Sequence, residues 1–526
     1  MRTLITKTKR SFAIVLAAAM VWSFSLSAVA ADSSLATASL KNVTTIAGSG
    51  AYEQADGAAG SSSFRAPQGL AVLNDGTILV SDTQNHLIRA IKNGQVSTYA
   101  GITFDIDSRS VPIGGLADGE RQLAVFNQPV GVVEDSQGNL YVADSQNHVI
   151  RKIDTKGQVS IHAGHPDGEL GLTDGSALGA RFYLPTDIAI AEDGTIYVAD
   201  TLNHVIRRIS PAGTVTTLNA TAERAVEVTP GQVVLAGDYR DGRLSNALFN
   251  EPSGLVLDAQ GNLYVSDSGN QAIRYINLAL GTVSTVAGGT FSAYEDQALY
   301  RAGDYVDGAA ASARFDAPKG LALTADGGLL IADSSNHAIR LLQSGIVSTV
   351  AGSANAIPGN VDGTETSGRL MFPTDVAVTA SGDIYVADAY NNAIRKISAY
   401  TLPAGISADS TIQVAIGSKL ITFDAEPQKV NSRVMVPVRA IAEELGYEVE
   451  TDDNIIIRLT KGEAVIELEV GSANAKTSTG DQTSAVKLDA EPYIKDSRTY
   501  VPVRFISEQL GNQVDWVQSH QAVIIR

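Results

Sequence analysis

The sequence has 526 residues, a formal net charge of −18 and no cysteine. The lack of cysteine excludes disulfides and thiolate chemistry, and the acidic balance disfavours a nucleic-acid partner because negative charge is repelled by phosphates. A chain of this length is sufficient for at least two domains, whose stability must come from buried apolar surface.

Residues 1–30 have the parts of a secretory signal peptide: a basic start, an apolar segment over residues 12–26, and small residues before a cleavage expected between Ala30 and Ala31. The alternative, a transmembrane span, needs about 20 apolar residues, and this run is shorter. Loss of these thirty residues, which carry four basic and no acidic side chains, changes the formal charge from −18 to −22. No later segment of the sequence could span a bilayer, so we expect a secreted or extracellular protein, with cell-wall association left open.

One pattern recurs six times between residues 56 and 395. Each unit opens with Asp-Gly, has a large apolar residue eight positions after that aspartate and a proline eleven positions after it, and reaches a second aspartate at twenty-six positions. The apolar residue is phenylalanine in five units and Leu370 in the sixth. The opening aspartates are Asp56, Asp118, Asp174, Asp241, Asp307 and Asp362. A fixed period over six copies indicates a repeat architecture.

The second aspartate begins a signature, such as Asp144-Ser-Gln-Asn-His-Val-Ile-Arg151, in which an arginine follows by seven residues. We predict that each aspartate accepts backbone N–H groups in its own turn and pairs with its arginine in the adjacent strand. A ring of carboxylates that binds a cation is the alternative. The six pairs are Asp82 and Arg89, Asp144 and Arg151, Asp200 and Arg207, Asp267 and Arg274, Asp333 and Arg340, and Asp388 and Arg395.

Each unit contains four short apolar runs bounded by glycine and aspartate, a pattern typical of strands. In the second unit the runs cover residues 131–133, 140–143, 149–153 and 159–163, and tight turns between them indicate an antiparallel meander. Pro129 fits the entry to the first strand, and a small residue near the axis lets neighbouring units approach. Six such sheets arranged radially form a β-propeller, so the expected fold class is mainly β.

The ends of the array predict how the ring closes. The last unit has no fourth strand, whereas a fourth-strand sequence occurs at residues 43–48, before the first unit. We expect this N-terminal strand to pair into the last blade, which makes residues 41–400 one domain. The connections after the fourth strands differ in length, with an insertion at residues 220–231 and a long loop at 290–304. Such loops on one face are candidate binding elements.

The six units resemble NHL repeats, named for the Asn-His-Leu triplet that stands here as Asn85-His86-Leu87. The resemblance covers about two thirds of the chain and implies a six-bladed propeller. NHL domains include protein-binding modules, RNA-binding modules, receptor sensor domains and peptidyl-amidoglycolate lyases. The resemblance therefore does not define an activity.

A linker at residues 401–410 leads to a second pattern in residues 411–526. Val436-Pro-Val-Arg439 returns as Val501-Pro-Val-Arg504, and each motif is followed by apolar residues at helical spacing and a glycine stop, Gly446 or Gly511. With strands expected at residues 412–416, 455–459, 464–470 and 522–525, this is a small α+β domain. It resembles the stalk domain named after the N-terminal domain of copper amine oxidases. That resemblance implies no oxidase activity, because the oxidase cofactor motif is absent from this sequence.

Histidines test for a metal enzyme. Four of the seven occupy one signature position, where the other two units have Gln271 and Asn392, so we interpret this position as a hydrogen-bonding one. The three that are left, at positions 162, 165 and 520, cannot make a three-histidine zinc site within the propeller. The Asp-Gly pairs allow a calcium interpretation, but they lack calcium-loop spacing, and a turn or helix N-cap role is favoured. We therefore predict no cofactor, with calcium as the alternative.

Two functions of different class are compatible with these observations. The first is a non-catalytic secreted or cell-surface protein whose propeller recognises a protein or an envelope glycan through its uneven loops. The second is a metal-dependent lyase or lactonase that uses the propeller channel. The sequence leaves open whether the stalk domain binds wall polymer or acts as a spacer, and it does not indicate an oligomeric state.

Overall fold

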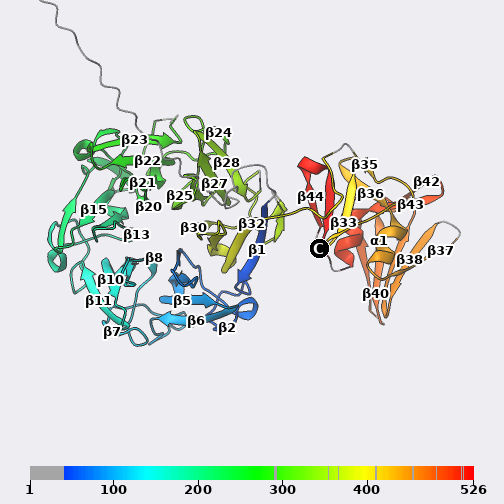
Figure 1. Cartoon of the computed structure of the whole chain (residues 1–526), viewed down its shortest axis with the longest axis horizontal. Helices are drawn as coiled ribbons and strands as arrows, with labels where there is room; N and C mark the ends of the chain where they lie inside the picture. Colours follow the sequence, from blue (N-terminus) through cyan, green and yellow to red (C-terminus); the bar gives the residue numbers. More distant parts are fainter. Residues whose placement is uncertain are drawn as a thin grey trace, which may run out of the picture.

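The computed structural model describes residues 41–109, 111–289, 293–353, 355–364, 367–408, 411–452, 455–480, 482–510, 512 and 514–526. The expected signal peptide and its cleavage site at Ala30 and Ala31 lie outside these residues. The described chain forms a ring of sheets followed by a smaller domain (Figure 1).

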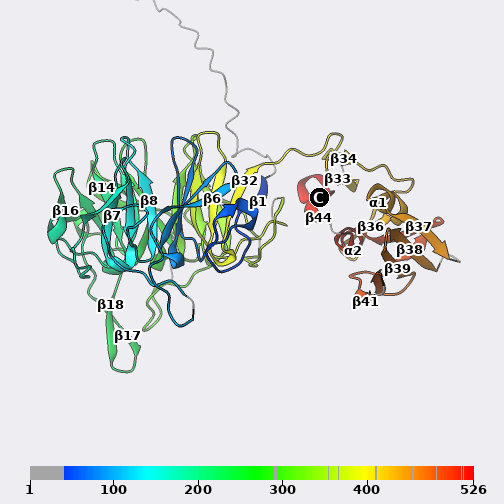
Figure 2. The same ribbon diagram turned by 90° about the horizontal axis from the view of Figure 1, so that it is seen from below.

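Six antiparallel sheets of five strands each make up the described ring (Figures 1 and 2). The first strands surround the axis and are β3 Gly69–Val72, β8 Pro129–Glu134, β13 Pro185–Ile190, β20 Pro252–Leu257, β25 Pro318–Leu323 and β30 Pro373–Val378. The second strands are β4 Ile78–Asp82, β9 Leu140–Asp144, β14 Ile196–Asp200, β21 Leu263–Asp267, β26 Leu329–Asp333 and β31 Ile384–Asp388. The third strands are β5 Leu87–Lys92, β10 Val149–Ile153, β15 Val205–Ile209, β22 Ala272–Asn277, β27 Ala338–Gln343 and β32 Ala393–Ala399.

The outer strands complete each blade. The fourth strands are β6 Gln95–Ala100, β11 Gln158–Ala163, β16 Thr214–Thr217, β23 Thr282–Ala287, β28 Ile346–Ala351 and, in the last blade, β1 Lys41–Ala47. A fifth strand, which the sequence did not predict, is formed by the Asp-Gly glycine and the next residue: β2 Gly57–Ala58, β7 Gly119–Glu120, β12 Gly175–Ser176, β19 Gly242–Arg243, β24 Gly308–Ala309 and β29 Gly363–Thr364. These two-residue strands are too short to give a periodic signal.

The N-terminal strand closes the ring. β1 pairs antiparallel with β32, with Val43 opposite Ile397 and Thr45 opposite Arg395, and it also pairs with β29. The predicted six-bladed propeller, closed by its own N-terminal strand, is confirmed.

Apolar side chains from neighbouring blades pack into clusters between the sheets. The cluster between the first two blades includes Leu79 and Ile88 from one and Phe126 and Val142 from the other, all fully buried. Because sheets cover both faces of a second strand, all five residues of β4 are buried. Burial of one such side chain contributes roughly 1.5–3 kcal/mol, so the repeated phenylalanine, replaced by Leu370 in the sixth blade, stabilises the blade interfaces.

The C-terminal domain contains three described sheets and two described α-helices. The helices are α1 Val438–Glu444 and α2 Val503–Gln509. The strands of its first two sheets are β33 Gln413–Ile416, β34 Lys419–Leu420, β44 Val514–Val517 and β45 Ala522–Ile525, and then β35 Gln428–Val430, β36 Arg433–Pro437, β42 Tyr493–Lys495 and β43 Arg498–Pro502. The strands of the third are β37 Glu448–Asp452, β38 Ile456–Lys461, β39 Ala464–Glu469, β40 Asn474–Thr479 and β41 Gln482–Lys487.

Both Val-Pro-Val-Arg motifs stand where a strand becomes a helix. β36 and β43, which end at Pro437 and Pro502, pair antiparallel, and each proline immediately precedes a helix rather than lying inside its first turn. Gly446 has a positive φ of 82° after α1, as its predicted role as a stop requires, whereas Gly511 lies outside the described residues. No described helix is both long enough and apolar enough to cross a bilayer.

Candidate functional site

Every signature aspartate ends a second strand and is fully buried. In the second blade the Asp144 carboxylate accepts hydrogen bonds from the Asn127 N–H (2.7 Å), the Asn147 side-chain amide (2.8 Å) and the Arg151 guanidinium (2.9 Å). Burial raises the pKa of Asp144 to about 6, because loss of water outweighs the attraction of Arg151. The equivalent ion pairs are Asp82 with Arg89, Asp200 with Arg207, Asp267 with Arg274, Asp333 with Arg340 and Asp388 with Arg395.

Each signature arginine has a second carboxylate partner, which the sequence reasoning missed. The Arg151 guanidinium lies 2.7 Å from Asp118 of the Asp-Gly pair, and its central carbon lies 5.0 Å from the centre of the Phe126 ring. The other oxygen of Asp118 accepts the Ile161 N–H of the fourth strand (3.1 Å). The contact with the opening aspartate recurs in all six blades.

The Asp-Gly aspartates are not helix N-caps, contrary to that part of the prediction. The short 3-10 helix after the first pair, η1 Ala59–Ser61, has Ala58 at its N-cap, without a side-chain capping bond. The carboxylate oxygens are instead engaged by the arginine and by the fourth strand. Those same oxygens would have to coordinate a calcium ion, so the contacts favour a structural role.

The signature histidines join each blade to the next. His86 has a left-handed backbone with a φ of 58°, and its Nδ1 accepts the Gln128 N–H of the second blade (2.9 Å). Burial lowers the pKa of His204 to about 4, which keeps its imidazole neutral and able to accept. The same bond to the following blade is made by His148, His204, Gln271, His337 and Asn392.

Two carboxylates line the axis, where the sequence predicted small residues. The second position after the entry proline is glycine in four blades, but it is Asp187 in the third and Asp375 in the sixth, two blades that are opposite in the ring. Asp187 accepts the Leu255 N–H of the fourth blade, and Asp375 accepts the Leu70 N–H of the first, both at 2.7 Å. Burial raises the pKa of Asp187 to about 7, and burial together with the charge of Asp187 raises the pKa of Asp375.

Close packing explains the glycines at the other four positions. A Cβ added to Gly69 would lie 1.9 Å from the Val130 carbonyl oxygen, and one added to Gly320 would lie 2.0 Å from Asp375 Oδ1. The second of these distances shows that the Asp375 carboxylate lies over a glycine of the neighbouring blade. A departure from glycine at this position was therefore the sequence signal for the axial pair.

A cavity of about 130 Å³ opens at the axis, on the face where the first strands begin. Its lining includes Asp187, Asp375, Glu251 and Lys319. Tyr300 donates a hydrogen bond to Glu251 (2.9 Å), and burial raises the pKa of Glu251 and lowers that of Lys319. Sites for drug-sized ligands usually have about 300–1,000 Å³, so this cavity is suited to much smaller species.

The insertion in the third unit is a hairpin, β17 Arg224–Thr229 and β18 Gln232–Ala236, which projects from the propeller (Figure 2). The Arg224 guanidinium fastens it to the loop before the fifth blade, donating to the carbonyls of Ala298 (2.6 Å) and Leu299 (2.7 Å) and lying 3.7 Å from the centre of the Tyr294 ring. The same loop reaches the axial cavity through Tyr300. Hairpin, loop and cavity mouth are therefore connected.

Exposed apolar side chains occur in all six connections between blades. These connections lie on the face that surrounds the cavity mouth, because each one follows a fourth strand that ends on that face. The most exposed in the six connections, in chain order, are Tyr52 (52%), Ile106 (55%), Leu170 (53%), Leu235 (70%), Tyr300 (44%) and Ile357 (46%). Exposed apolar groups on one face make that face a candidate surface for binding another molecule.

One described group of side chains has a composition that could hold a metal ion: His165, Asp167 and Glu169, in the connection after the second blade. The imidazole Nδ1 already accepts the Asp167 N–H (3.3 Å), and Glu169 is paired with Arg181. Two of the three groups are exposed. This arrangement does not resemble a closed zinc site, whose ligands are supported by buried partners.

Two protein-family models match this chain, one in each domain. The NHL repeat model matches residues 64–91, 126–153, 249–274 and 370–397, and the model of the copper amine oxidase N-terminal domain matches residues 414–525. This chain is an NHL-repeat propeller with a copper amine oxidase N-terminal domain. The third and fifth blades of this NHL propeller, which the repeat model does not match, have the same strands and the same Asp–Arg pair.

Curated relatives share the propeller region. The chain is 30% identical over 297 residues to the Arabidopsis thaliana protein SUPPRESSOR OF QUENCHING 1, chloroplastic. The aligned region covers 54% of this chain and 26% of the relative. The chain is also 30% identical over 351 residues to NHL repeat-containing protein 2 of Bos taurus, and the aligned region covers 62% of this chain and 45% of the relative. The chain thus spans less than half of either protein.

Solved structures give more distant similarities. An auxiliary nutrient binding protein from Bacteroides ovatus has a TM-score of 0.47 and 17% identity, covering 69% of this chain and 78% of that chain. Virginiamycin B lyase from Staphylococcus aureus has a TM-score of 0.40 and 14% identity, covering 68% of this chain and 100% of that chain. At this level of similarity neither structure bears on the activity of the NHL propeller.

Proposed function

We propose that this protein is exported and binds a partner protein or envelope glycan through the loop-bearing face of its propeller, without catalysis, as a secreted or cell-wall-associated scaffold. The observation that carries the proposal is the set of exposed apolar side chains in all six connections around one mouth. Burial of apolar surface is the main favourable contribution to most protein association, and tyrosine is frequent among the residues that carry binding energy. A protein is therefore the favoured partner for this face.

The Arg224 contacts give this face a defined shape. A projecting hairpin that moved freely would lose conformational entropy on binding, which lowers affinity. Here three hydrogen bonds from Arg224, to Gly237, Ala298 and Leu299, hold the hairpin before any partner arrives. Val233 (61% exposed) and Leu235 point outward from β18, because they alternate with the less exposed Val234.

The test is capture of envelope proteins by the purified chain, with and without a charge on the apolar face. Leu235→Asp should reduce capture of specific partners strongly, since it places a charge in the contact area. Leu280→Asp is the matched control, because Leu280 is 75% exposed in the turn between β22 and β23, at the opposite end of a blade. Equal capture by the two variants would contradict the proposed face.

The second candidate is a metal-dependent lyase or lactonase, and the axial pair of Asp187 and Asp375 favours it. Buried carboxylates with raised pKa values are frequent in active sites. Metal analysis of the purified protein distinguishes the two candidates. A stoichiometric divalent ion, or an increase in Tm with zinc or calcium that Asp187→Asn removes, would favour the enzyme; no bound ion and no increase would favour the binding protein.

A further inference from the structure

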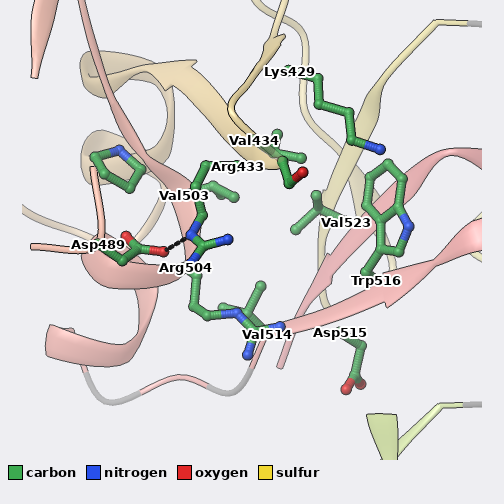
Figure 3. A pocket seen from close by; sticks show the side chains of 12 residues that line it. Lys429, Arg433, Val434, Asp489, Val503, Arg504, Val514, Asp515, Trp516 and Val523 are labelled. Carbon is green, nitrogen blue, oxygen red and sulfur yellow. Dashed lines mark ion pairs between the residues drawn. The ribbon is translucent and has the colours of Figure 1, made fainter. Parts of the chain in front are cut away.

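The C-terminal domain contains a pocket of about 310 Å³, where the sheet of β35, β36, β43 and β42 meets the sheet of β34, β33, β45 and β44 (Figure 3). The second Val-Pro-Val-Arg motif contributes to its wall through Pro502, Val503 and Arg504. Trp516 and Lys429 stand on the other side of the opening (Figure 3). The volume is sufficient for a sugar unit, at the lower end of the range of about 300–1,000 Å³ for small-molecule sites.

The charges in this pocket do not balance. Arg433 is paired with Asp489 (2.6 Å), and Asp515 is paired with Arg526 and accepts the hydroxyl of Ser367 from the propeller (2.7 Å). Among the described residues, neither Lys429 nor Arg504 has an ion-pair partner. The pocket therefore contains two cationic side chains without an ion-pair partner, in a domain that carries more acidic than basic side chains.

An aromatic surface lies beside these two cations. The indole N–H of Trp516 donates to Gln518 Oε1 (2.7 Å), which fixes the ring, and the Lys429 ammonium lies 5.5 Å from the ring centre. The ring is half-buried. A tryptophan has an apolar face against which the C–H groups of a sugar can pack, and a guanidinium binds carboxylate or phosphate through two parallel hydrogen bonds.

The first copy of the motif lines a pocket of different chemistry, of about 470 Å³, whose lining contains two glutamates and no aromatic residue. Arg439 is the equivalent of Arg504, sixty-five residues earlier, but it lies 3.7 Å from Glu443. At the same spacing, Thr451 takes the place of Trp516. The two motifs share a fold element and differ in their surroundings. Side chains from both halves line the aromatic and cationic pocket, which lies beside the second motif and is not repeated beside the first.

We propose that this pocket binds an anionic sugar unit of an envelope polysaccharide, with Trp516 against the sugar ring and Arg504 and Lys429 on its carboxylate or phosphate. This site is separate from the propeller face, and the proposal holds whatever that face binds. The stalk would then attach the protein to a polymer and present the propeller.

Trp516 also provides the measurement. The sequence has two tryptophans, Trp22 in the expected signal peptide and Trp516, so a chain lacking residues 1–30 has one tryptophan, located in the pocket, whose fluorescence can be excited separately from that of the tyrosines. Polygalacturonate supplies a carboxylate-bearing glycan, purified teichoic acid supplies a phosphate-bearing one, and dextran is the neutral control. We expect a saturable change in Trp516 fluorescence with at least one of the anionic polymers and none with dextran, and the responding polymer identifies the anion.

Arg504→Gln and Lys429→Gln should each weaken that binding about tenfold or more, the effect of losing one charge-assisted hydrogen bond. Arg439→Gln is the matched control and should bind as the unchanged protein does. Both altered side chains in the pocket are exposed, so an unchanged Tm will show that the variants fold. Binding of dextran with equal affinity, equal losses for Arg439→Gln and Arg504→Gln, or no saturable signal with either anionic polymer would each overturn the proposal.

Discussion

Asn392 in the last blade accepts a hydrogen bond from the backbone N–H of Ala66 in the first blade, at 3.1 Å and across 326 residues of sequence. Its side-chain amide also donates to the Gly50 carbonyl (3.1 Å). The other five blade junctions use the same bond, but in those the two blades are adjacent in sequence. Only here does it join the ends of the ring.

Asn392→Gly should lower the free energy of unfolding by about 1 kcal/mol, at the lower end of the cost of leaving an N–H without an acceptor, because the Ala66 N–H is only partly buried. Glycine is chosen because Asn392 has a φ of 51°, which alanine would adopt only with strain. Asn93 has the same φ and lies exposed in the turn between β5 and β6, so Asn93→Gly is the control and should change stability by less than about 0.5 kcal/mol. Urea unfolding measures both, and equal effects would show that the junction bond does not contribute to stability.

Asp144→Ala should lower the free energy of unfolding by about 3–5 kcal/mol, because it leaves the buried Arg151 guanidinium with one carboxylate in place of two. It also removes the acceptor of the Asn127 N–H. Glu223→Ala replaces an exposed carboxylate and should have almost no effect. Thermal unfolding of the two variants decides the matter: a Tm for Asp144→Ala equal to that of the unchanged protein contradicts the structural role of the signature.

Periodicity was sufficient to predict the propeller, the closing strand and the Asp–Arg pairs, because all three follow from a register that is fixed within one unit. In every copy the aspartate and the arginine are seven residues apart, on two strands joined by one turn, as Asp82 and Arg89 are in the first copy. The exchange of His, Gln and Asn at one signature position indicated hydrogen bonding, and the structure places all six side chains in such bonds.

Contacts between units could not be predicted in the same way. Asp187 and Asp375 approach because the six blades form a narrow ring, and the ring radius is not encoded in any single repeat. Arg224 contacts Leu299 because two irregular insertions fold toward each other, and Lys429 contacts Trp516 where two separate sheets of the C-terminal domain meet. In the last two cases the local sequence has no period, so pattern analysis gives no register for the contact.

The axial pair predicts a pH dependence of stability. The pKa of Asp187 is raised from 3.8 to about 7 in the folded protein, so the folded state holds the proton more tightly than the unfolded state does. This contribution to stability is fully present below the unfolded pKa and is lost as the pH rises through about 7. The double variant Asp187→Asn and Asp375→Asn should therefore lose less stability than the unchanged protein between about pH 5 and pH 8.5.

Urea unfolding at several pH values measures the free energy of unfolding of both proteins. Subtracting the value of the double variant from that of the unchanged protein at each pH removes the contribution of the other titrating groups, which the two proteins share. Asp296→Asn, which changes an exposed carboxylate, is the control and should leave the pH dependence as it is. If the double variant keeps the full pH dependence, the axial carboxylates are ionised in the folded protein at neutral pH.

The Arg224 contacts predict where the loop face loses order. Arg224→Ala removes the donors to Gly237, Ala298 and Leu299, so amide hydrogen exchange should accelerate about tenfold in residues 225–235 and 293–300, as expected for a loss of at least one charge-assisted hydrogen bond. Arg243 is exposed in β19, and its side chain has no hydrogen bond within the described residues, so Arg243→Ala is the control. Exchange in the blade strands should stay unchanged, because the hairpin packs outside the ring. Acceleration in the hairpin alone would show that the loop at 293–300 is held by Tyr300 and Glu251 instead, and that the two parts of the face move independently.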